Sequence, residues 1–467
     1  MALTKAHNRM LEGAPVNVKD FGAVGDGVTD DTAAIQAAID SFGASTSSSA
    51  RGLVRLPKGT YKVTSSLYLP IEVSLVGDGG RTTKIVGDGD FEIIQWYSDI
   101  PTYSKGVKIS GIWLSGSGVG SGNTNNTGIR LDHPFGMDHL TLEDIRLDGF
   151  AGYGIQTDQQ GSGATTNCFQ FSTWNNIRIE NCGTGVLMGE GFCGESTIND
   201  LVITDCTTYG VEFGISATSV GAQGLTFNNL VIGRCPTGVY FGAGTSGMIV
   251  FNSGHFENLD SIGVHLNATN NKGLLFNGSW FVNTPTGFKC DAAATAATFD
   301  SCVWETTGAA GDEFVDINSG GPFVFEGHNQ ANGTLPTNQI EAYTFDIILG
   351  NVDRTSTTTG SFNDYKISKY YGQFRGLCGE DSLNEAANLT GRVAVGSGAS
   401  SVNVSLGRTE ADANYNVVAT INFTTGTPTF FPGYSIGNKS TTGFTVYFSG
   451  ATPAGGYVLD WILMRSI

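Results

Sequence analysis

Carboxylate, imidazole and aromatic side chains recur at regular intervals in this chain, and their types suit carbohydrate chemistry. Hydrolysis of a glycosidic bond uses two carboxyl groups, which are about 5 Å apart in retaining enzymes and roughly 6.5–9.5 Å apart in inverting ones. We predict Glu257 and Glu305 as this catalytic pair. His255 and Trp280 are predicted to bind substrate beside them, because an indole ring stacks well on a sugar. Arg178 is a substrate-binding candidate earlier on the same predicted face.

A second set of residues with the same interval suits proton transfer. A polysaccharide lyase needs one group that removes the proton beside a uronate carboxylate and another that protonates the leaving oxygen. Glu212 is the catalytic candidate in this set, and the substrate-binding candidates are Tyr240, His265 and Lys289. A third place for the site is a groove between the subunits of a homotrimer, with carboxylates from two chains.

Both sets are spaced by a repeat that runs from Leu142 to about Phe325. An apolar residue followed by Asn or Asp returns at steps of 24, 29, 24, 25 and 23 residues, namely at Trp174, Ile198, Phe227, Phe251, Phe276 and Phe299. A second motif, Gly and then an apolar residue, follows each first one, at Gly154, Gly185, Gly210, Gly238, Gly263 and Gly287. Self-similarity with a period in the twenties indicates a solenoid whose repeats bury their apolar faces against their neighbours.

The residue types favour strands over helices in this solenoid. Apolar residues alternate along each repeat, as in Leu201 and Ile203, which is the period of a strand. Gly, Asn, Thr, Phe and Val are abundant, whereas helical repeats are rich in Ala, Leu and Glu. If one strand returns parallel in each turn, equivalent residues stack one above another. We therefore predict an internal ladder at the Trp/Ile/Phe position.

Two further ladders follow from the same stacking. The Asn residues are predicted to line a bend, where a side-chain amide can satisfy the backbone and its neighbours, at Asn175, Asn199, Asn228, Asn252 and Asn277. Cys182, Cys206 and Cys235 are predicted to form a third internal stack. Neighbouring rungs are about 4.8 Å apart, so Glu257 and Glu305, two rungs apart, would be at roughly the inverting distance.

Composition and charge narrow the possible partners. The 467 residues include 66 Gly and only 15% charged residues, which suits many tight turns, and the formal charge of −18 argues against nucleic acid or an anionic membrane. No apolar run approaches the ~20 residues that span a bilayer. The first 15 residues lack a signal-peptide core, which predicts synthesis and assembly in a cytosol. Eight scattered Cys without a CxxC pair favour reduced thiols over disulfides.

The N-terminal part of the chain resembles a known family. The segment Asp20–Gly27 (DFGAVGDG) with Asp30 and Asp31, and the segment Leu53–Tyr61 (LVRLPKGTY), resemble the opening of the pectate-lyase-like right-handed parallel β-helix superfamily. That superfamily includes rhamnogalacturonase- and polygalacturonase-like enzymes and many bacteriophage tailspikes. The resemblance covers roughly residues 16–325. It implies that the acidic residues of the opening cap an entry helix, so structural roles are expected for Asp26, Asp30 and Asp31.

The sequence departs from the pectin-degrading members of that superfamily. It has no Asn-Thr-Asp followed by Asp-Asp and Gly-His-Gly, and Gly254-His255-Phe256 is only a partial match to the last motif. It also lacks the clustered Asp ligands with an Arg that calcium-dependent pectate lyases carry. We therefore expect no metal and no other cofactor.

Composition, turn residues and strand patterns divide the sequence into four predicted regions. Residues 1–15 are expected to be an attachment or capping segment, residues 16–350 the parallel β-helix with its short capping helix, and residues 351–390 a linker. Residues 391–467 carry short strands parted by Gly, Pro and Asn, which predicts an antiparallel β-sandwich. This last part resembles the modules of phage tail proteins that trimerise or bind glycan.

The predicted function is that of a phage tailspike-like depolymerase on a virion tail. It would bind and cleave a bacterial surface polysaccharide (capsule, exopolysaccharide or O-antigen) as a homotrimer, with hydrolysis favoured over elimination. Its N-terminus would attach to a baseplate or tail adaptor. Two alternatives stay open: a non-enzymatic receptor-binding or structural tail protein on the same fold, and a secreted pectinase-like enzyme.

Overall fold

Nearly all regular structure in the described part of this chain is β-strand. We describe it from a computed structural model, whose described residues include one α-helix, α1 (Thr32–Asp40), and one short 3-10 helix, η2 (Val18–Phe21), both near the N-terminus. The structure describes residues 15–43, 51–96, 104–120, 122–123, 126–132, 136–157, 167–189, 192–214, 222–242, 245–267, 270–291, 296–309, 311–318, 323–326, 330–331, 340–342, 347–349, 374–376, 390–406, 413, 415–425, 432–454 and 456–464. The described strands form two compact units, one ending at Gly376 and the other beginning at Thr390.

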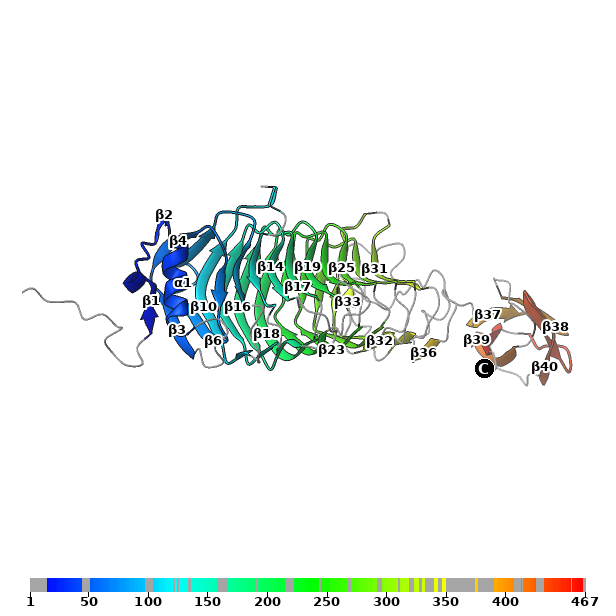
Figure 1. Cartoon of the computed structure of the whole chain (residues 1–467). Coiled ribbons are helices and arrows are strands. Elements are labelled where there is room, and N and C mark those ends of the chain that lie inside the picture. Colours follow the sequence, from blue (N-terminus) through cyan, green and yellow to red (C-terminus); the bar gives the residue numbers. More distant parts are fainter. Residues whose placement is uncertain are drawn as a thin grey trace, which may run out of the picture. The chain divides into compact units, whose positions relative to one another are not determined.

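The first unit is a right-handed parallel β-helix, as the sequence predicts (Figure 1). Its larger sheet contains β1 (Val16–Asn17), β2 (Asp26–Asp30), β3 (Arg51–Leu56), β4 (Gly59–Val63), β6 (Glu72–Gly77), β7 (Thr83–Gly87), β9 (Ser104–Lys105), β10 (Lys108–Ser115), β12 (Met137–Asp138), β13 (Thr141–Asp148), β15 (Asn167–Gln170), β16 (Thr173–Glu180), β18 (Phe192–Thr204), β20 (Ala222–Asn228), β21 (Val231–Gly233), β23 (Thr245–Asn252), β24 (His255–Glu257), β26 (Asn270–Asn277), β27 (Trp280–Val282), β29 (Ala297–Asp300), β30 (Val303–Trp304), β32 (Phe323–Glu326), β33 (Gln330–Ala331), β35 (Ile347–Leu349) and β36 (Phe374–Gly376).

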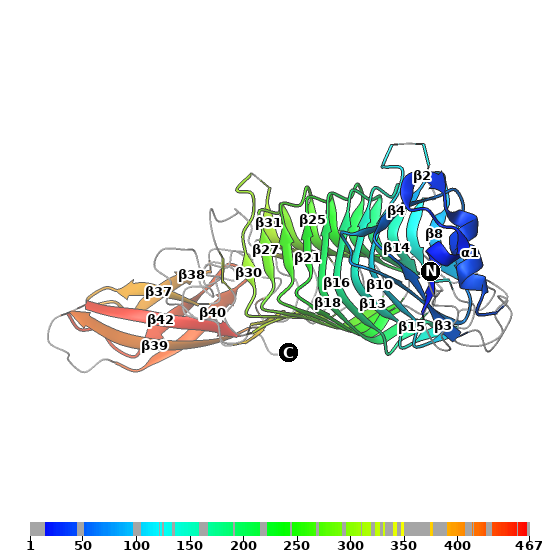
Figure 2. The same ribbon diagram turned by 90° about the vertical axis from the view of Figure 1, so that its left-hand side faces the viewer.

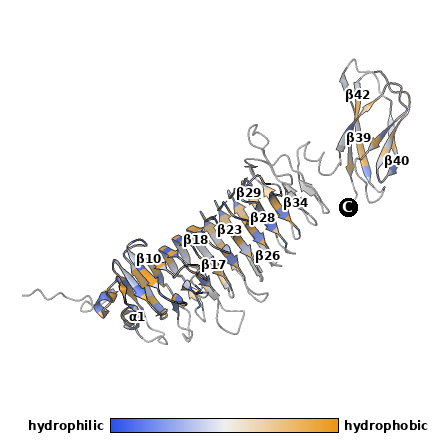
Figure 3. Cartoon of the chain, turned by 90° about the horizontal axis from the view of Figure 1, so that it is seen from above, coloured by the Kyte–Doolittle hydropathy of each residue, from blue (hydrophilic) through white to orange (hydrophobic). Residues whose placement is uncertain are grey.

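A smaller sheet forms another side of the same coil. It contains β5 (Leu67–Leu69), β8 (Glu92–Trp96), β11 (Thr127–Arg130), β14 (Tyr153–Thr157), β17 (Thr184–Met188), β19 (Tyr209–Phe213), β22 (Thr237–Phe241), β25 (Ile262–Leu266), β28 (Thr286–Cys290), β31 (Glu313–Ile317) and β34 (Ile340–Ala342). Hydrophobic and hydrophilic residues alternate along the strands (Figure 3), as expected when one face of each strand packs inside the coil.

Stacked aromatic rings fill the interior and confirm the predicted apolar ladder. The ring centroids of Phe227 and Phe251 are 5.0 Å apart, those of Phe251 and Phe276 are 4.9 Å apart, and those of Phe276 and Phe299 are 5.1 Å apart. All four side chains are fully buried. Stacked rings at this spacing combine apolar burial with ring–ring attraction, so they are a main source of stability in these rungs.

The two other predicted ladders are also present. Each Asn amide donates to the side-chain carbonyl of the Asn one rung before it, at 2.7 Å from Asn199 to Asn175, 2.8 Å from Asn228 to Asn199, 2.9 Å from Asn252 to Asn228 and 3.3 Å from Asn277 to Asn252. Cys182, Cys206 and Cys235 are buried and free of disulfides. Burial raises the pKa of the Cys182 thiol to about 12, so this sulfur stays protonated.

The repeated Gly-apolar motif has a steric cause. A Cβ atom on Gly210 would lie 2.6 Å from the carbonyl oxygen of Gly238 in the next rung and 2.5 Å from Cγ2 of Ile232. The corresponding Cβ on Gly185 would lie 2.6 Å from the carbonyl oxygen of Gly210. Only glycine therefore lets these strands stack at the spacing of the coil.

The N-terminal end of the coil is closed by α1, which packs through buried Ile35, Ala38 and Ile39 (Figure 2). Asp31 occupies the N-cap position, but its carboxylate makes no cap bond and instead accepts the backbone N–H groups of Val24 at 2.6 Å and Gly25 at 2.9 Å. Asp30 accepts the N–H of Thr32 at 3.0 Å. These bonds fit the structural role that the resemblance implies for both residues.

The described strands of the second unit form two antiparallel three-stranded sheets. One contains β37 (Thr390–Val395), β42 (Gly456–Met464) and β39 (Asn416–Thr425), and the other contains β38 (Ser401–Ser405), β41 (Gly443–Phe448) and β40 (Tyr434–Ser440). Their buried residues, including Val446, Leu459 and Trp461, form one core, as the predicted sandwich requires. In the predicted linker, β36 pairs in parallel with β35. The predicted attachment segment lies outside the described residues except for Pro15.

Within the described part of the chain, no helix is both long and apolar enough to cross a membrane.

Candidate functional site

The smaller sheet brings Glu212, Tyr240, His265 and Lys289 into one outward column, as the sequence predicts. Parallel register pairs Glu212 with Tyr240, Tyr240 with His265, and His265 with Lys289. These side chains therefore come from four consecutive rungs, with steps of about 4.8 Å between their backbones. We call these four residues the Glu212 column.

Glu212 is partly buried. Burial raises the pKa of its carboxyl to about 7, so the side chain is partly protonated at neutral pH. Leu187, which pairs with Glu212 on the preceding rung, is only 1% exposed although it points outward. Tyr209 stacks on Tyr240 with ring centroids 4.5 Å apart, and burial together with Tyr240 and Glu212 raises the pKa of Tyr209. The sheet surface around Glu212 is thus apolar and aromatic.

His265 is oriented by a carboxylate. Its Nε2 atom lies 2.8 Å from Oδ2 of Asp291, and the other oxygen of Asp291 accepts the amide of Asn318 at 2.7 Å. Burial alone would raise the pKa of Asp291, but the bonds from His265 and Asn318 and the charge of Lys289 keep it below its usual range. An ionised Asp291 favours a proton on Nε2 and leaves Nδ1 of His265 as the basic nitrogen.

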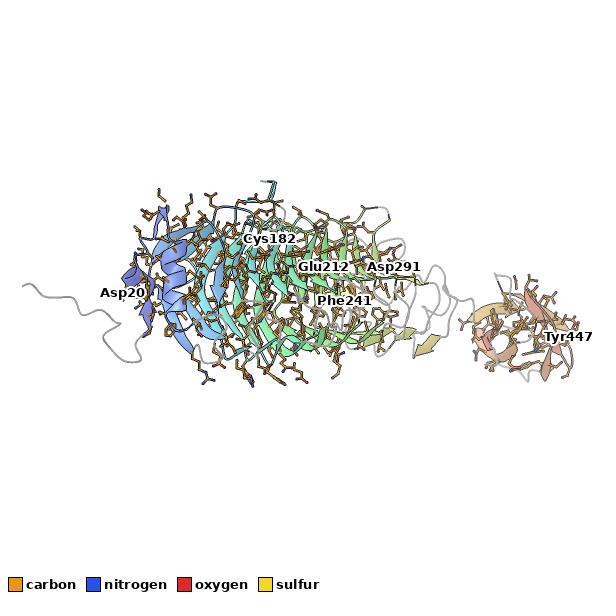
Figure 4. All side chains as sticks on the ribbon, viewed as in Figure 1. Asp20, Cys182, Glu212, Phe241, Asp291 and Tyr447 are labelled. Carbon is orange, nitrogen blue, oxygen red and sulfur yellow. The ribbon has the colours of Figure 1, made fainter. Side chains whose placement is uncertain are left out.

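Tyr240 has an equally defined environment. The amide of Asn267 donates to its hydroxyl oxygen at 2.8 Å, so the hydroxyl proton is directed elsewhere. The rings of Tyr240 and His265 meet edge to face, with centroids 5.3 Å apart. Lys289 is less available to bind a substrate, because its ammonium group donates to Asp316 at 2.8 Å. Figure 4 marks Glu212 and Asp291 in the C-terminal half of the β-helix.

The sequence analysis missed the residues that orient this column. Asn267, Asp291 and Asn318 form a ladder of their own, because each follows the last inward residue of its strand and bonds through its backbone N–H to the preceding rung. The same period that located the Gly motif would have aligned these three residues. Tyr209 gave no such signal, since its contact with Tyr240 depends on side-chain direction.

The second candidate face lies on the larger sheet and is more exposed. His255 pairs with Trp280, and their rings meet edge to face with centroids 5.7 Å apart. Trp280 is 51% exposed, and Nε2 of His255 lies 3.5 Å from Oε2 of Glu257. Glu305 donates its backbone N–H to Phe281, which places it about two rungs from Glu257. The two carboxyl groups therefore come from strands that fit the spacing expected for an inverting pair.

Arg178 is not brought to His255. Three register steps separate them, through Val202 and Val231. The guanidinium of Arg178 instead binds Glu180, with Nε and Oε1 at 2.8 Å.

No described group of three or more His, Cys, Asp or Glu side chains could hold a metal ion.

Comparison with known proteins shows that a family model matches most of the β-helix. A family model described as rhamnogalacturonase A/epimerase, pectate lyase-like, matches residues 15–265, which include Glu212, Tyr240 and His265. A mannuronan C5-epimerase of Azotobacter vinelandii is 36% identical over 164 residues. The preneck appendage protein of Bacillus phage PZA is 31% identical over 184 residues. The matches cover 31% and 36% of this chain but only 15% and 20% of the lengths of these two relatives.

Solved structures share the fold at low identity. A tailspike protein of Escherichia coli bacteriophage HK620, solved with a pentasaccharide, aligns with a TM-score of 0.56 and 12% identity, over 97% of this chain and 94% of that one. A surface adhesin of Streptococcus pneumoniae aligns with a TM-score of 0.52 and 13% identity, over 78% of this chain and 96% of that one. At such identities the likeness concerns the fold alone.

Proposed function

The chain belongs to the rhamnogalacturonase A/epimerase, pectate lyase-like family, and on that basis we propose that it binds and cleaves a bacterial surface polysaccharide as a tailspike-like phage protein. A phage appendage protein is among its sequence relatives, and a tailspike with a bound pentasaccharide has the same fold. A polysaccharide epimerase is another relative. Glycan recognition on a phage tail accounts for these similarities together.

The observation that carries the proposal is the Glu212 column. Glu212, Tyr240 and His265 supply a carboxyl with a pKa of about 7, a hydroxyl and a carboxylate-oriented imidazole on three consecutive rungs. Proton-transfer groups with such properties are unusual on a solvated surface and common at active sites. By contrast, Glu257 and His255 on the other face are about one-third exposed.

These groups support cleavage by β-elimination. His265, oriented by Asp291, would remove the proton beside a uronate carboxylate through Nδ1. Tyr240, one rung away, would protonate the leaving glycosidic oxygen. Protonated Glu212 would donate a hydrogen bond to the uronate carboxylate and so favour loss of the neighbouring proton. The sequence favours hydrolysis, but no second carboxylate lies within two register steps of Glu212 among the described residues of this column.

Glu257 and Glu305 support the alternative of hydrolysis on the larger sheet. Half-exposed Trp280 beside them would also serve binding without cleavage, as in a receptor-binding protein. A surface adhesin shares this fold, so the fold is compatible with a function in binding alone.

The assembly remains part of the proposal. The chain would act at the bacterial surface as a homotrimer on the virion tail, attached through residues 1–15 to a baseplate or adaptor and assembled in the host cytoplasm. The phage appendage relative supports this location.

Product analysis tests the proposed function. Purified capsular, exopolysaccharide and O-antigen glycans are incubated with the protein, and new reducing ends and the ultraviolet absorbance of unsaturated uronates are recorded. Elimination gives both signals, whereas hydrolysis gives reducing ends alone. Binding without either signal across the glycans would leave the receptor-binding function.

Asp291→Asn is expected to lower kcat by about 10- to 100-fold with KM unchanged, because Asp291 positions His265 without touching the glycan. The measurement is a steady-state comparison with the wild type, and Asp291→Glu should restore part of the rate. Asp316→Asn is the matched control, since the described bond of that carboxylate is to Lys289 at 2.8 Å and not to His265. Equal losses in both variants would argue against a positioning role for Asp291.

A further inference from the structure

A row of cationic side chains lies on the early rungs of the larger sheet. Register pairs Lys84 with Trp113, Trp113 with Arg146, and Arg146 with Arg178. The row therefore spans three rung steps, or about 14 Å. It occupies the strand position that holds His255 and Trp280 farther along the coil. We call Lys84, Trp113, Arg146 and Arg178 the cationic row.

Direct contacts hold the cationic row together. The ammonium of Lys84 lies 4.0 Å from the ring centroid of Trp113, and the guanidinium carbon of Arg146 lies 4.4 Å from it. The indole is thus paired with a cation from each neighbouring rung. Glu180 accepts Arg146 and Arg178, each at 2.7 Å, and these partners keep its pKa below the usual range although burial opposes this.

The row keeps a positive charge on an acidic protein. Glu180 is a single carboxylate shared by two guanidinium groups, and no carboxylate among the described residues pairs with Lys84. Asp148 also lies nearby, beside Glu180 in the register, and accepts an amide of Asn181 at 2.9 Å. Glu180 offsets part of the repulsion between the like charges on these neighbouring rungs, and a bound anion would offset more of it.

We propose that the cationic row is a binding site, separate from the Glu212 column, for the acidic groups of a polysaccharide that lies along the coil. Sugars of an extended glycan repeat at nearly the rung spacing. Carboxylates or sulfates on two successive sugars can therefore meet Arg146 and Arg178, and an acidic group two sugars before Arg146 can meet Lys84. Arginine suits this task, because its fork binds planar oxyanions in a bidentate manner. Nucleic acid fits less well, since it needs exposed aromatic platforms and Trp113 lies between two cations.

This site rests on the proposed function in one respect, because it names the glycan substrate class as acidic, which elimination also requires. Binding and cleavage can nevertheless be measured apart. If the protein binds an acidic glycan through the row and cleaves none, the proposed reaction fails and the site stands. If it cleaves glycans and the row variants bind as the wild type does, the site fails alone.

Equilibrium binding to defined probes tests the inference. The probes are polygalacturonate, which carries carboxylates, dextran sulfate, neutral dextran and a single-stranded oligonucleotide. The variants are Lys84→Gln, which removes only a contact with Trp113, and the double variant Lys84→Gln with Arg178→Gln. The matched control is Arg51→Gln with Lys105→Gln, an exposed arginine and an exposed lysine on β3 and β9, strands that carry no residue of the row. Melting curves confirm that each variant is folded.

We expect binding of at least one acidic glycan and not of neutral dextran. The double variant should bind the acidic glycan about tenfold more weakly than the control, with a weaker dependence on salt. Equal weakening in the control would overturn the site, as would equal binding of neutral dextran. Oligonucleotide binding with the same dependence on Lys84 and Arg178 would overturn the assignment to a polysaccharide.

Discussion

Replacing Glu212 with Gln is expected to lower the rate of polysaccharide cleavage by about 10²–10³-fold, the usual cost of removing one hydrogen-bond donor that stabilises the charge developing in the transition state. The amide keeps the shape of the side chain but cannot titrate, and it donates a weaker hydrogen bond to a uronate carboxylate. In the wild type, activity should fall as pH rises through about 7, where Glu212 loses its proton. Initial rates of product formation across this pH range are the measurement.

Glu257→Gln is the matched control, because it makes the same exchange on the more exposed face. A full rate in the Glu212 variant together with a large loss in Glu257→Gln or Glu305→Gln would move the site to the larger sheet.

The same substitution has an independent effect on stability. The pKa of Glu212 is raised from 4.5 to about 7 in the folded protein, so the stability gained from the neutral form is complete below about pH 4.5 and is lost as pH rises through about 7. The Gln variant should therefore become more stable than the wild type above about pH 8. Because Glu212 is only partly buried, solvent screening limits the difference to about 1–2 kcal/mol.

Phe251→Ala is expected to destabilise the β-helix by about 3–5 kcal/mol, the usual cost of deleting a buried aromatic ring. Phe251 is fully buried and stacks on Phe227 and Phe276, so its loss leaves a cavity bounded by two rungs. Repeats in a solenoid are stabilised mainly by their neighbours, so the loss should spread along the coil. The change in the free energy of unfolding is measured by denaturant unfolding, with folding and unfolding rates recorded.

Phe171→Ala serves as the control for that prediction. Phe171 is 49% exposed, so the same exchange should change the free energy of unfolding by only a few tenths of a kcal/mol to about 1 kcal/mol. Equal destabilisation by both variants would contradict the view that the internal ladder dominates stability.

Much of the fold could be predicted from the sequence, because a solenoid repeats one local pattern. Once the Phe and Asn positions recur, parallel stacking determines their neighbours, and Phe227, Phe251 and Phe276 lie one above another as expected. The hydrogen bonds at the start of α1 were less predictable. Asp31 was a natural N-cap from its position, but its side chain bonds to the turn at Val24 and Gly25, which depends on how the turn folds back.

The site could be predicted only as far as strand register extends. Alternation placed Glu212, Tyr240 and His265 in one column without structural information. It could not foresee that Glu212 is poorly hydrated or that Asp291 bonds to His265, because both depend on side-chain direction and on neighbouring chain segments. The contacts of the charged side chains could not be foreseen either: Arg178, a substrate-binding candidate earlier on the same face as His255, has its guanidinium bound to Glu180.

The most direct test of the central claim is the structure of the Glu212→Gln variant bound to an oligosaccharide of its own polysaccharide. We predict sugar density along the smaller sheet, with one ring within hydrogen-bond distance of position 212, the hydroxyl of Tyr240 and the imidazole of His265. Sugar bound over Trp280 and Glu257, or between subunits with the Glu212 column empty, would contradict the account.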